Sequence, residues 1–503
     1  MTSAQSYFGP ANFLADILNI KLAYKRYKIN EEKTSLFPFA GFPYTQLDKY
    51  LKILVQDLGH TVVLVEEYQR DPEAGRIPRQ VGRVVTPGTL VDESWLMGEE
   101  SRYLLAIAIG QPNLAPQQDE KPSLALSLAY TDVSTGEFFA KDTTVAQMED
   151  EFARIAPREV VLDNSLQPLW LAQLEKPSSP DAGTISDLLA LLRVLGVHVS
   201  FADSYRPPIL DRPALTSDLP TSFPTTLESF AISLLRHHLQ FALRDSMPDL
   251  PSEPDRQFSS AHMQIDAATL HALEIRHAIR PGGLMASGET HGTSPLSARG
   301  TLLSVLNRTS TPSGHRLLIR TLTTPSTSLD TINSRLDLVQ TFVDRRELRE
   351  ELRGLIKNIR DVMRMVQLFR GKRGDGRSIW ETGRWIRAVS RLLDRIQDEI
   401  NHEGGSAKAS SEEVDRLKEL LLSFRHLDEL QKRIEDAIDE EALLQGVDPS
   451  ESAEEAEGIE AAGEAIEDNS TAKKRTSGMI REQKELDREG KEGAMWWIRP
   501  RSA

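Results

Sequence analysis

The chain has 503 residues, no cysteine and a formal net charge of -15. Its length predicts several domains, because single hydrophobic cores stop growing well below this size. The lack of cysteine excludes disulfides, thiolate catalysis and cysteine-based zinc sites, and no apolar run reaches the roughly 18 residues that suggest a membrane span.

Charge is distributed unevenly along the chain. Residues 308–395 contain 19 Lys/Arg and 10 Asp/Glu, whereas residues 435–468 contain 14 acidic residues and no basic one. An arginine-rich helical region could lie along nucleic-acid phosphates. The alternative, solvated helix faces with internal ion pairs, is favoured on charge alone.

Residues 1–100 have the pattern of a small α/β domain. An amphipathic helix is predicted almost at the start, in SYFGPANFLADILNIKL. A turn at Gly41–Pro43 and then a helix are predicted from FPFAGFPYTQLDKYLKILVQDLG. A strand is predicted from HTVVLVEEY, and a further apolar run, RQVGRVVTPG, ends in a turn at Pro87 and Gly88.

A second α/β domain is predicted for residues 101–255. Two apolar strands joined by a hairpin at Ser134–Gly136 are predicted from LALSLAYTDVSTGEFFAKD. Helix-then-strand patterns follow in MEDEFARIAPREVVLDN and LLALLRVLGVHVSFAD. This alternation is typical of a sheet flanked by helices.

The second half of the chain is predicted to be α-helical. Long helical patterns fill residues 256–445, whereas residues 446–480 are rich in Ser, Glu, Ala and Gly and predict a disordered or loosely helical insert. The chain closes on AMWWIRPRSA, where two adjacent tryptophans have no following element to pack against. We therefore expect the chain to be cut there.

Catalytic motifs are few. The spacing of Gly371 and Gly376 approaches a phosphate-binding loop, but a helix precedes it and Arg377 replaces the required Lys, so a polar turn between helices is favoured. Asp132, with Glu137 five residues on, could hold a divalent metal at a strand end. Two-metal chemistry needs three or four converging carboxylates, and so many are not found nearby. The favoured interpretation is therefore that Asp132 supports the hairpin turn.

Four stretches lie in an order that can be compared with a known family. They are FAGFPYTQLDKYLKILVQDLGHTVVLVEEYQ with VGRVVTPGTLVDE, LALSLAYTDVSTGEFFAKD with FARIAPREVVLD, MQIDAATLHALEI with GTLLSVLNRTSTPSGHRLLIRTLTTPSTSLDTINSRLDLVQTF, and WWIRP. They resemble, in turn, the mismatch-binding domain, connector, core with lever helices, and lever-to-clamp segment of the MutS family of DNA mismatch repair proteins. The first stretch is most similar to the family's fungal mitochondrial branch.

The resemblance implies a multidomain α/β + α fold. It places a small α/β mismatch-binding domain at 1–100, a ribonuclease-H-like connector at 101–255, and an α-helical core and lever domain at 256–445. The acidic insert then occupies 446–480 and a lever-to-clamp segment 481–503. Compared with members of the family, we expect the chain to be truncated at both ends, with the first domain incomplete.

The resemblance also implies structural roles for matching residues. Arg316 is expected to tie helices together within a turn-and-helix signature, while Asn333 and Arg335 match a second, buried polar signature. The other matches are Gly41, Pro43, Arg83, Thr86, Pro87, Gly88, Asp132, Gly136, Thr309, Thr311, Pro312 and Gly314.

Members of the family insert a Phe wedge beside a mispaired base, and a Glu two residues later hydrogen-bonds that base. An ungapped overlay puts Ser3 at the wedge and Gln5 at the Glu. Serine cannot stack, and Gln5 could still offer a hydrogen bond, but we expect no upstream strand to hold it. The family also uses ATP and Mg²⁺, whereas no GxxxxGK[ST] occurs here, so the chain as given is expected to be no enzyme and to need no cofactor.

The resulting hypothesis is a MutS-type protein that binds mismatched double-stranded DNA weakly, as a homodimer or with other repair proteins, and not a membrane. Localisation is expected to be mitochondrial by resemblance, with the nucleus as the alternative. A short non-catalytic isoform that binds repair partners is the main competing hypothesis. Nuclease activity through Asp132 is a third.

Overall fold

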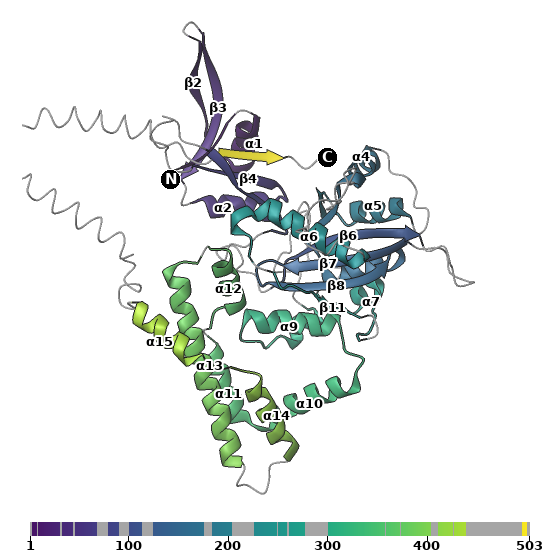
Figure 1. Ribbon diagram of the computed structural model, residues 1–503, viewed down its shortest axis with the longest axis vertical. Helices are drawn as coiled ribbons and strands as arrows, with labels where there is room; N and C mark the ends of the chain where they lie inside the picture. Colours follow the sequence, from purple (N-terminus) through teal and green to yellow (C-terminus); the bar gives the residue numbers. More distant parts are fainter. Residues whose placement is uncertain are drawn as a thin grey trace, which may run out of the picture.

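The computed structural model describes most of the first 438 residues and one later strand. The described ranges are 3–7, 9–30, 33–43, 46–67, 79–89, 100–112, 124–175, 184–203, 226–248, 250–258, 261–276, 300–357, 359–372, 374–403, 411–425, 427–438 and 495–499. The predicted insert at 446–480 lies outside them. Within these ranges the chain forms two six-stranded sheets and a helical body (Figure 1).

The first sheet has the strand order β2-β3-β1-β12-β4-β5, and the β2–β3 hairpin projects from it (Figure 1). Most of its pairs are antiparallel, while β12 runs parallel to β1. The strands are β1 (Ser3–Tyr7), β2 (Leu22–Asn30), β3 (Lys33–Pro43), β4 (Thr61–Glu67), β5 (Arg79–Val85) and β12 (Met495–Arg499).

Strand β12 lies within the last part of the chain, residues 481–503, whose role as a lever-to-clamp segment stays a prediction. Met495–Arg499 pairs with β4 on one side and with β1 on the other. The physical reason is local: MWWIR is rich in aromatic and β-branched residues, which suit a paired strand. The strand bridges β1 and β4, so the two halves of the sheet form one.

Helices cover one face of the first sheet. Helix α1 (Gly9–Leu18) buries Ala11 and Leu14, and α2 (Leu47–Leu51) continues as a π-helical turn, Lys52–Asp57. The predicted turn at Gly41–Pro43 is wrong, because these residues are the end of β3 and pair with β1. Pairing with a distant strand overrides the local Gly/Pro signal, and Pro43 is tolerated because it lies beyond Ala40, the last β3 residue paired with β2, so that β3 is an edge strand there.

The second sheet has the order β10-β9-β6-β7-β8-β11. Strands β6, β7 and β8 are antiparallel neighbours, whereas β9 and β10 are added in parallel beyond β6. The strands are β6 (Tyr103–Pro112), β7 (Leu124–Asp132), β8 (Glu137–Thr144), β9 (Glu159–Asp163), β10 (His198–Ala202) and β11 (Asp255–Arg256). The predicted hairpin and both helix-then-strand units are confirmed.

Both faces of the second sheet are buried. Leu126 and Leu128 of β7 pack with α3 (Met148–Ile155) and α5 (Ile185–Val194), while Ala129 faces the cluster made with α6 (Leu227–Leu243). Helix α4 (Gln167–Glu175) lies beside α5. Burial on both sides explains why LALSLAY reads as a continuous apolar run and not as an alternating one.

The helical body follows the second sheet and extends away from it (Figure 1). The long helical pattern of residues 336–369 is broken into three helices, with interruptions at Arg345 and between Ile356 and Val362. Helices α11, α13 and α14 share a core of Leu348, Leu352, Ile396, Ile400 and Leu417. The helices are α7 (Ala267–Ala272), α8 (Leu302–Leu306), α9 (Pro312–Thr323), α10 (Leu329–Asp344), α11 (Arg346–Ile356), α12 (Val362–Arg370), α13 (Gly376–Glu403), α14 (Ser411–Leu422) and α15 (Asp428–Ala437).

Candidate functional site

Strand β1 carries the two positions predicted to read a mispair. Ser3 pairs with Pro43 of β3, and Gln5 lies between Gly41 of β3 and Met495 of β12. The strands that hold Gln5 both follow it in the chain, and its backbone has neighbours on both sides. Ser3, Gln5, Gly41 and Pro43 share one part of the sheet.

The turn after β5 fixes the first sheet against the second. Arg83 lies in β5, and Thr86 closes the turn by hydrogen bonding Thr89 through both its backbone N–H and its hydroxyl, at 2.9 and 2.8 Å. The Gly88 N–H donates to Oε2 of Glu159 at 2.9 Å. A Cβ at Gly88 would lie 2.7 Å from Leu104 and 2.9 Å from the Glu159 Cβ, so glycine permits this approach.

Glu159 is fully buried at the start of β9 and was missed by sequence reasoning. Its Oε1 accepts a hydrogen bond from Ser200 at 2.5 Å and lies 3.2 Å from Nε2 of His238. Burial favours the neutral acid, yet His238, His198 and Ser200 together lower the pKa of Glu159 to about 2. The carboxylate therefore stays charged inside the protein. An acidic residue directly before the apolar run VVL in the strand EVVLD was the available signal.

Asp132 ends β7 and organises the hairpin turn. Its Oδ1 accepts hydrogen bonds from the N–H and hydroxyl of Ser134 at 3.0 and 2.7 Å, and its Oδ2 accepts one from the Arg102 N–H at 2.9 Å. Both carboxylate oxygens are thus engaged by the protein. Among the described residues, no three His, Asp or Glu side chains are grouped so that they could hold a metal ion.

Gly136 completes this turn against the helical body. Its φ is +75°, and a Cβ there would lie 1.7 Å from Nε2 of Gln367 in α12. Gln367 is itself buried. The hairpin and α12 are therefore in direct contact at a position that only glycine fits.

We expect Gly136→Ala to destabilise the protein by about 1–3 kcal/mol, because it combines a left-handed backbone with this clash. Urea unfolding measures the change. Gly354→Ala is the matched control: Gly354 lies in α11 with no atom within 4 Å of its added Cβ, so about 0.5–1 kcal/mol of stabilisation is expected. Unfolding of Gly136→Ala at the wild-type midpoint would contradict the tight contact.

Arg316 lies in α9 and joins it to α12. Its guanidinium binds both oxygens of Asp361, at 2.5 and 3.0 Å, and both side chains are buried. Burial opposes ionisation, but the hydrogen bonds and charge of Arg316 outweigh it and hold the pKa of Asp361 below its usual value. Arg364 Nε lies 3.6 Å from the same carboxylate, and its Nη2 donates to the Glu100 carbonyl at 3.2 Å.

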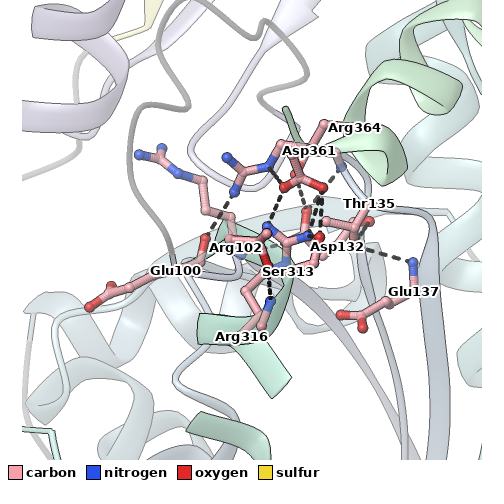
Figure 2. A network of polar contacts seen from close by, with 12 residues as sticks. Glu100, Arg102, Asp132, Thr135, Glu137, Ser313, Arg316, Asp361 and Arg364 are labelled. Atoms are coloured by element: carbon pink, nitrogen blue, oxygen red, sulfur yellow. Dashed lines mark hydrogen bonds and ion pairs between the residues drawn. The ribbon is translucent and has the colours of Figure 1, made fainter. Parts of the chain in front are cut away.

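Figure 2 shows Arg316 and Arg364 converging on Asp361 beside the turn formed by Asp132. A further pair, Arg320 with Glu137 at 2.9 Å, connects α9 to β8. The Arg320–Glu137 pair therefore fastens the second domain to the helical body, and the buried Arg316–Asp361 pair holds α9 to the start of α12 beside it. We call this set of contacts the junction.

Helix α9 begins with a well-formed cap. The hydroxyl of Thr311 accepts from the Gly314 N–H at 3.1 Å, and Pro312 occupies the first turn. Thr309 donates to the Asn307 side chain through its N–H and hydroxyl, at 3.1 and 2.6 Å. These residues fix the start of the helix that carries Arg316.

The burial predicted for Asn333 and Arg335 is wrong, because both are exposed on α10. This helix buries Thr341 alone among its described residues and leaves several large apolar side chains exposed. It therefore lies at the edge of the helical body, and only one flank of it is packed. The exposed apolar side chains are Leu329, Leu336, Val339 and Val343.

The arginine-rich stretch is internally paired in many places, as the ion-pair alternative predicted. Arg395 contacts Glu351 and Glu399, Arg360 contacts Glu381, and Arg387 contacts Glu435. The partial phosphate-loop pattern is a turn between α12 and α13, where Asp375 accepts from the Ser378 N–H at 2.8 Å. A carboxylate already occupies this helix start. In the described part of the chain, no helix is long and apolar enough to cross a bilayer.

Comparison with known families gives matches along most of the chain. The model for MutS domain I matches residues 5–94, that for MutS domain II matches 103–201, and that for MutS domain III matches 268–489. The three matches follow one another in domain order.

Curated relatives agree with these matches. The DNA mismatch repair protein MutS of Rickettsia canadensis is 27% identical over 383 residues, which cover 75% of this chain and 38% of that protein. Its namesake from Methanococcoides burtonii is 28% identical over 444 residues, covering 87% of this chain and 44% of that protein. That of Methanosarcina acetivorans is 29% identical over 419 residues, covering 80% and 42%. The matched region is less than half the length of each of these relatives.

Proposed function

The chain belongs to the MutS family of DNA mismatch repair proteins, and from this premise we propose that it binds duplex DNA through its first domain with little preference for a mispair. The observation that carries the proposal is the setting of β1. This strand is paired on both sides and runs directly toward α1, while Ser3 and Gln5 stand where the family has Phe and Glu.

The chemistry of these two positions sets the expected selectivity. A wedge reads a mispair because a mispaired step is easier to unstack and kink than a paired one. Serine has no aromatic face, so Ser3 gains nothing from an unstacked step. Gln5 can donate or accept a hydrogen bond but carries no charge. Affinity should then come mostly from phosphate contacts and fall steeply with salt.

We expect the double substitution Ser3→Phe with Gln5→Glu to raise the affinity ratio of mismatched to fully paired duplex at least tenfold, about 1.4 kcal/mol. Fluorescence anisotropy at constant salt measures both affinities. The control is Asn12→Phe, which adds a phenylalanine on the exposed side of α1 and should leave the ratio unchanged. If the double variant had the same ratio of affinities for mismatched and paired duplex as the parent, positions 3 and 5 would not be the mispair-reading positions.

We also propose that the second domain is a ribonuclease-H-like connector without nuclease activity. The strand order, three antiparallel strands extended by two parallel ones beyond the first, supports this fold. The engagement of both Asp132 oxygens by Ser134 and Arg102 supports a structural role. Mg²⁺-dependent cleavage of DNA that is lost in Asp132→Asn would contradict it.

Two further proposals concern the chain's setting. The 503 residues contain no GxxxxGK[ST] sequence, so we propose that they do not hydrolyse ATP by themselves. A phosphate-release assay with and without DNA tests this proposal.

The similarity of the first domain to the fungal mitochondrial branch supports a mitochondrial location. Microscopy of the protein tagged at its natural gene tests this, and an exclusively nuclear signal would contradict it.

A further inference from the structure

A cavity of about 190 Å³ lies where the second domain meets the helical body. The second domain contributes Tyr103, Tyr130 and Phe139 as an aromatic wall. The remaining lining residues come from both the second domain and the helical body, and most of the charged ones are arginines. The lining includes Arg154, Arg158, Arg276, Arg316 and Arg320, with Glu100 as the acidic residue among the described lining residues.

Four of these arginines already have acidic partners. Arg316 binds Asp361, Arg320 lies 2.9 Å from Glu137, Arg154 lies 2.6 Å from Glu151, and Arg158 lies 3.1 Å from Glu100. The Arg158 and Glu100 side chains are 37% and 54% exposed, so this pair is easily exchanged for another anion.

Arg276 differs from the other four. Its Nη2 donates to the Arg154 carbonyl at 3.1 Å, but its Nε is buried and has no hydrogen-bond partner among the described residues. No carboxylate in the described part of the chain forms an ion pair with it. A buried donor without a partner carries the full cost of its lost hydration.

The electrostatic setting agrees with this geometry. Burial lowers the pKa of Arg276, Glu100 and Tyr103 oppose that effect, and the nearby positive charges of Arg158 and Arg154 lower it further. Arginine stays protonated in proteins, so the lowered pKa reflects how unfavourable its charge is in this place. An anion in the cavity would offset the repulsion between Arg276 and the neighbouring arginines.

The size of the cavity limits the class of ligand. About 190 Å³ corresponds to roughly six water molecules at about 30 Å³ each. Pockets for drug-sized ligands begin at about 300 Å³, so a nucleotide is too large. A tetrahedral oxyanion fits, and its oxygens suit the planar fork of a guanidinium.

We propose that this cavity binds a small oxyanion of the phosphate class, held by Arg276 and Arg158, that bridges the second domain and the helical body. Arg158 follows α3 of the second domain, whereas Arg276 follows α7 of the helical body. The bound ion would thus add to the junction without replacing any of its ion pairs.

The test is isothermal titration of the full chain with inorganic phosphate at constant ionic strength, with chloride as the balancing anion. We expect saturable binding in the wild type and at least tenfold weaker binding in Arg276→Gln. Arg387→Gln, which alters an exposed ion pair with Glu435 far along the helical body, should bind phosphate as the wild type does. Arg158→Gln, at a partly exposed position, is a second variant should Arg276→Gln fail to fold.

Thermal unfolding provides an independent readout. Phosphate stabilises proteins generally by exclusion from their surface, and that part should be the same in every variant. The site-specific part should be missing from Arg276→Gln and present in Arg387→Gln. Equal phosphate responses in all variants, or no saturation in the wild type, would overturn the proposal. Loss of phosphate binding on addition of duplex DNA would instead assign the cavity to a DNA phosphate and would also overturn binding of the free ion.

Discussion

Replacing Arg316 with methionine is expected to lower the free energy of unfolding by about 3–5 kcal/mol. The substitution leaves Asp361 buried and charged, with a hydrogen bond from the Ser313 hydroxyl at 3.1 Å and the more distant cation of Arg364 at 3.6 Å. Removing one partner of a buried pair costs more than the pair itself contributes, because the remaining charge loses its hydration without compensation. Urea unfolding of the full chain measures the change.

Two comparisons separate this effect from a general loss of arginine. Arg387→Met breaks the pair with Glu435, whose side chains are 38% and 41% exposed, and should cost less than about 1 kcal/mol. The double substitution Arg316→Met with Asp361→Leu should recover much of the loss, because no unpaired charge remains. If Arg316→Met were as stable as the wild type, Asp361 could not be a buried carboxylate that depends on it.

The second large effect concerns Glu159 and pH. Its pKa is lowered from 4.5 to about 2 in the folded protein. A carboxyl group with a depressed folded pKa stabilises the protein above its unfolded pKa and loses that contribution as pH falls toward the folded value. The interval from 4.5 to about 2 corresponds to roughly 3 kcal/mol. We therefore expect Glu159→Gln to remove much of the acid sensitivity between these two pH values.

The measurement is urea unfolding at a series of pH values for both proteins. The Glu159→Gln variant should be the less stable of the two near neutral pH, and the difference should shrink as pH falls from 4.5 toward 2. Glu419 forms an ion pair with Arg416, and the Glu419 side chain is 70% exposed. Glu419→Gln should therefore keep the wild-type dependence of stability on pH. A Glu159→Gln profile parallel to that of the wild type would show that the carboxylate at this position is not linked to folding.

The sequence predicted the second domain well for a physical reason. Strand β7 is a continuous apolar run, the turn after it carries Asp132 and Gly136, and α3 has a clear amphipathic face. Local pattern and tertiary environment agree there. They disagree at Gly41–Pro43, where pairing with β1 makes a strand from turn-like residues, and at β12, whose partners lie more than four hundred positions earlier.

In the junction, too, a contact between residues distant in the chain could not be predicted from local sequence. Arg316 was predicted to tie helices together, but its partner was not predicted. Asp361 stands before α12, where an aspartate would normally cap the helix, and its side chain makes no cap hydrogen bond. It binds Arg316, 45 positions away, instead. The burial of Asn333 and Arg335 was implied by the family resemblance, whereas both lie on the exposed part of α10, a helix that buries only Thr341 among its described residues.

The most direct test of the proposed function is the affinity of the full chain for two duplexes that differ by one mispair, measured at constant salt. We predict binding to both, with a ratio below tenfold, because Ser3 offers no wedge and Gln5 no carboxylate. A ratio of tenfold or more, about 1.4 kcal/mol, would show that mismatch reading survives without these side chains. No binding to either duplex, with repair partners still captured, would support the interaction-protein alternative and contradict the proposal.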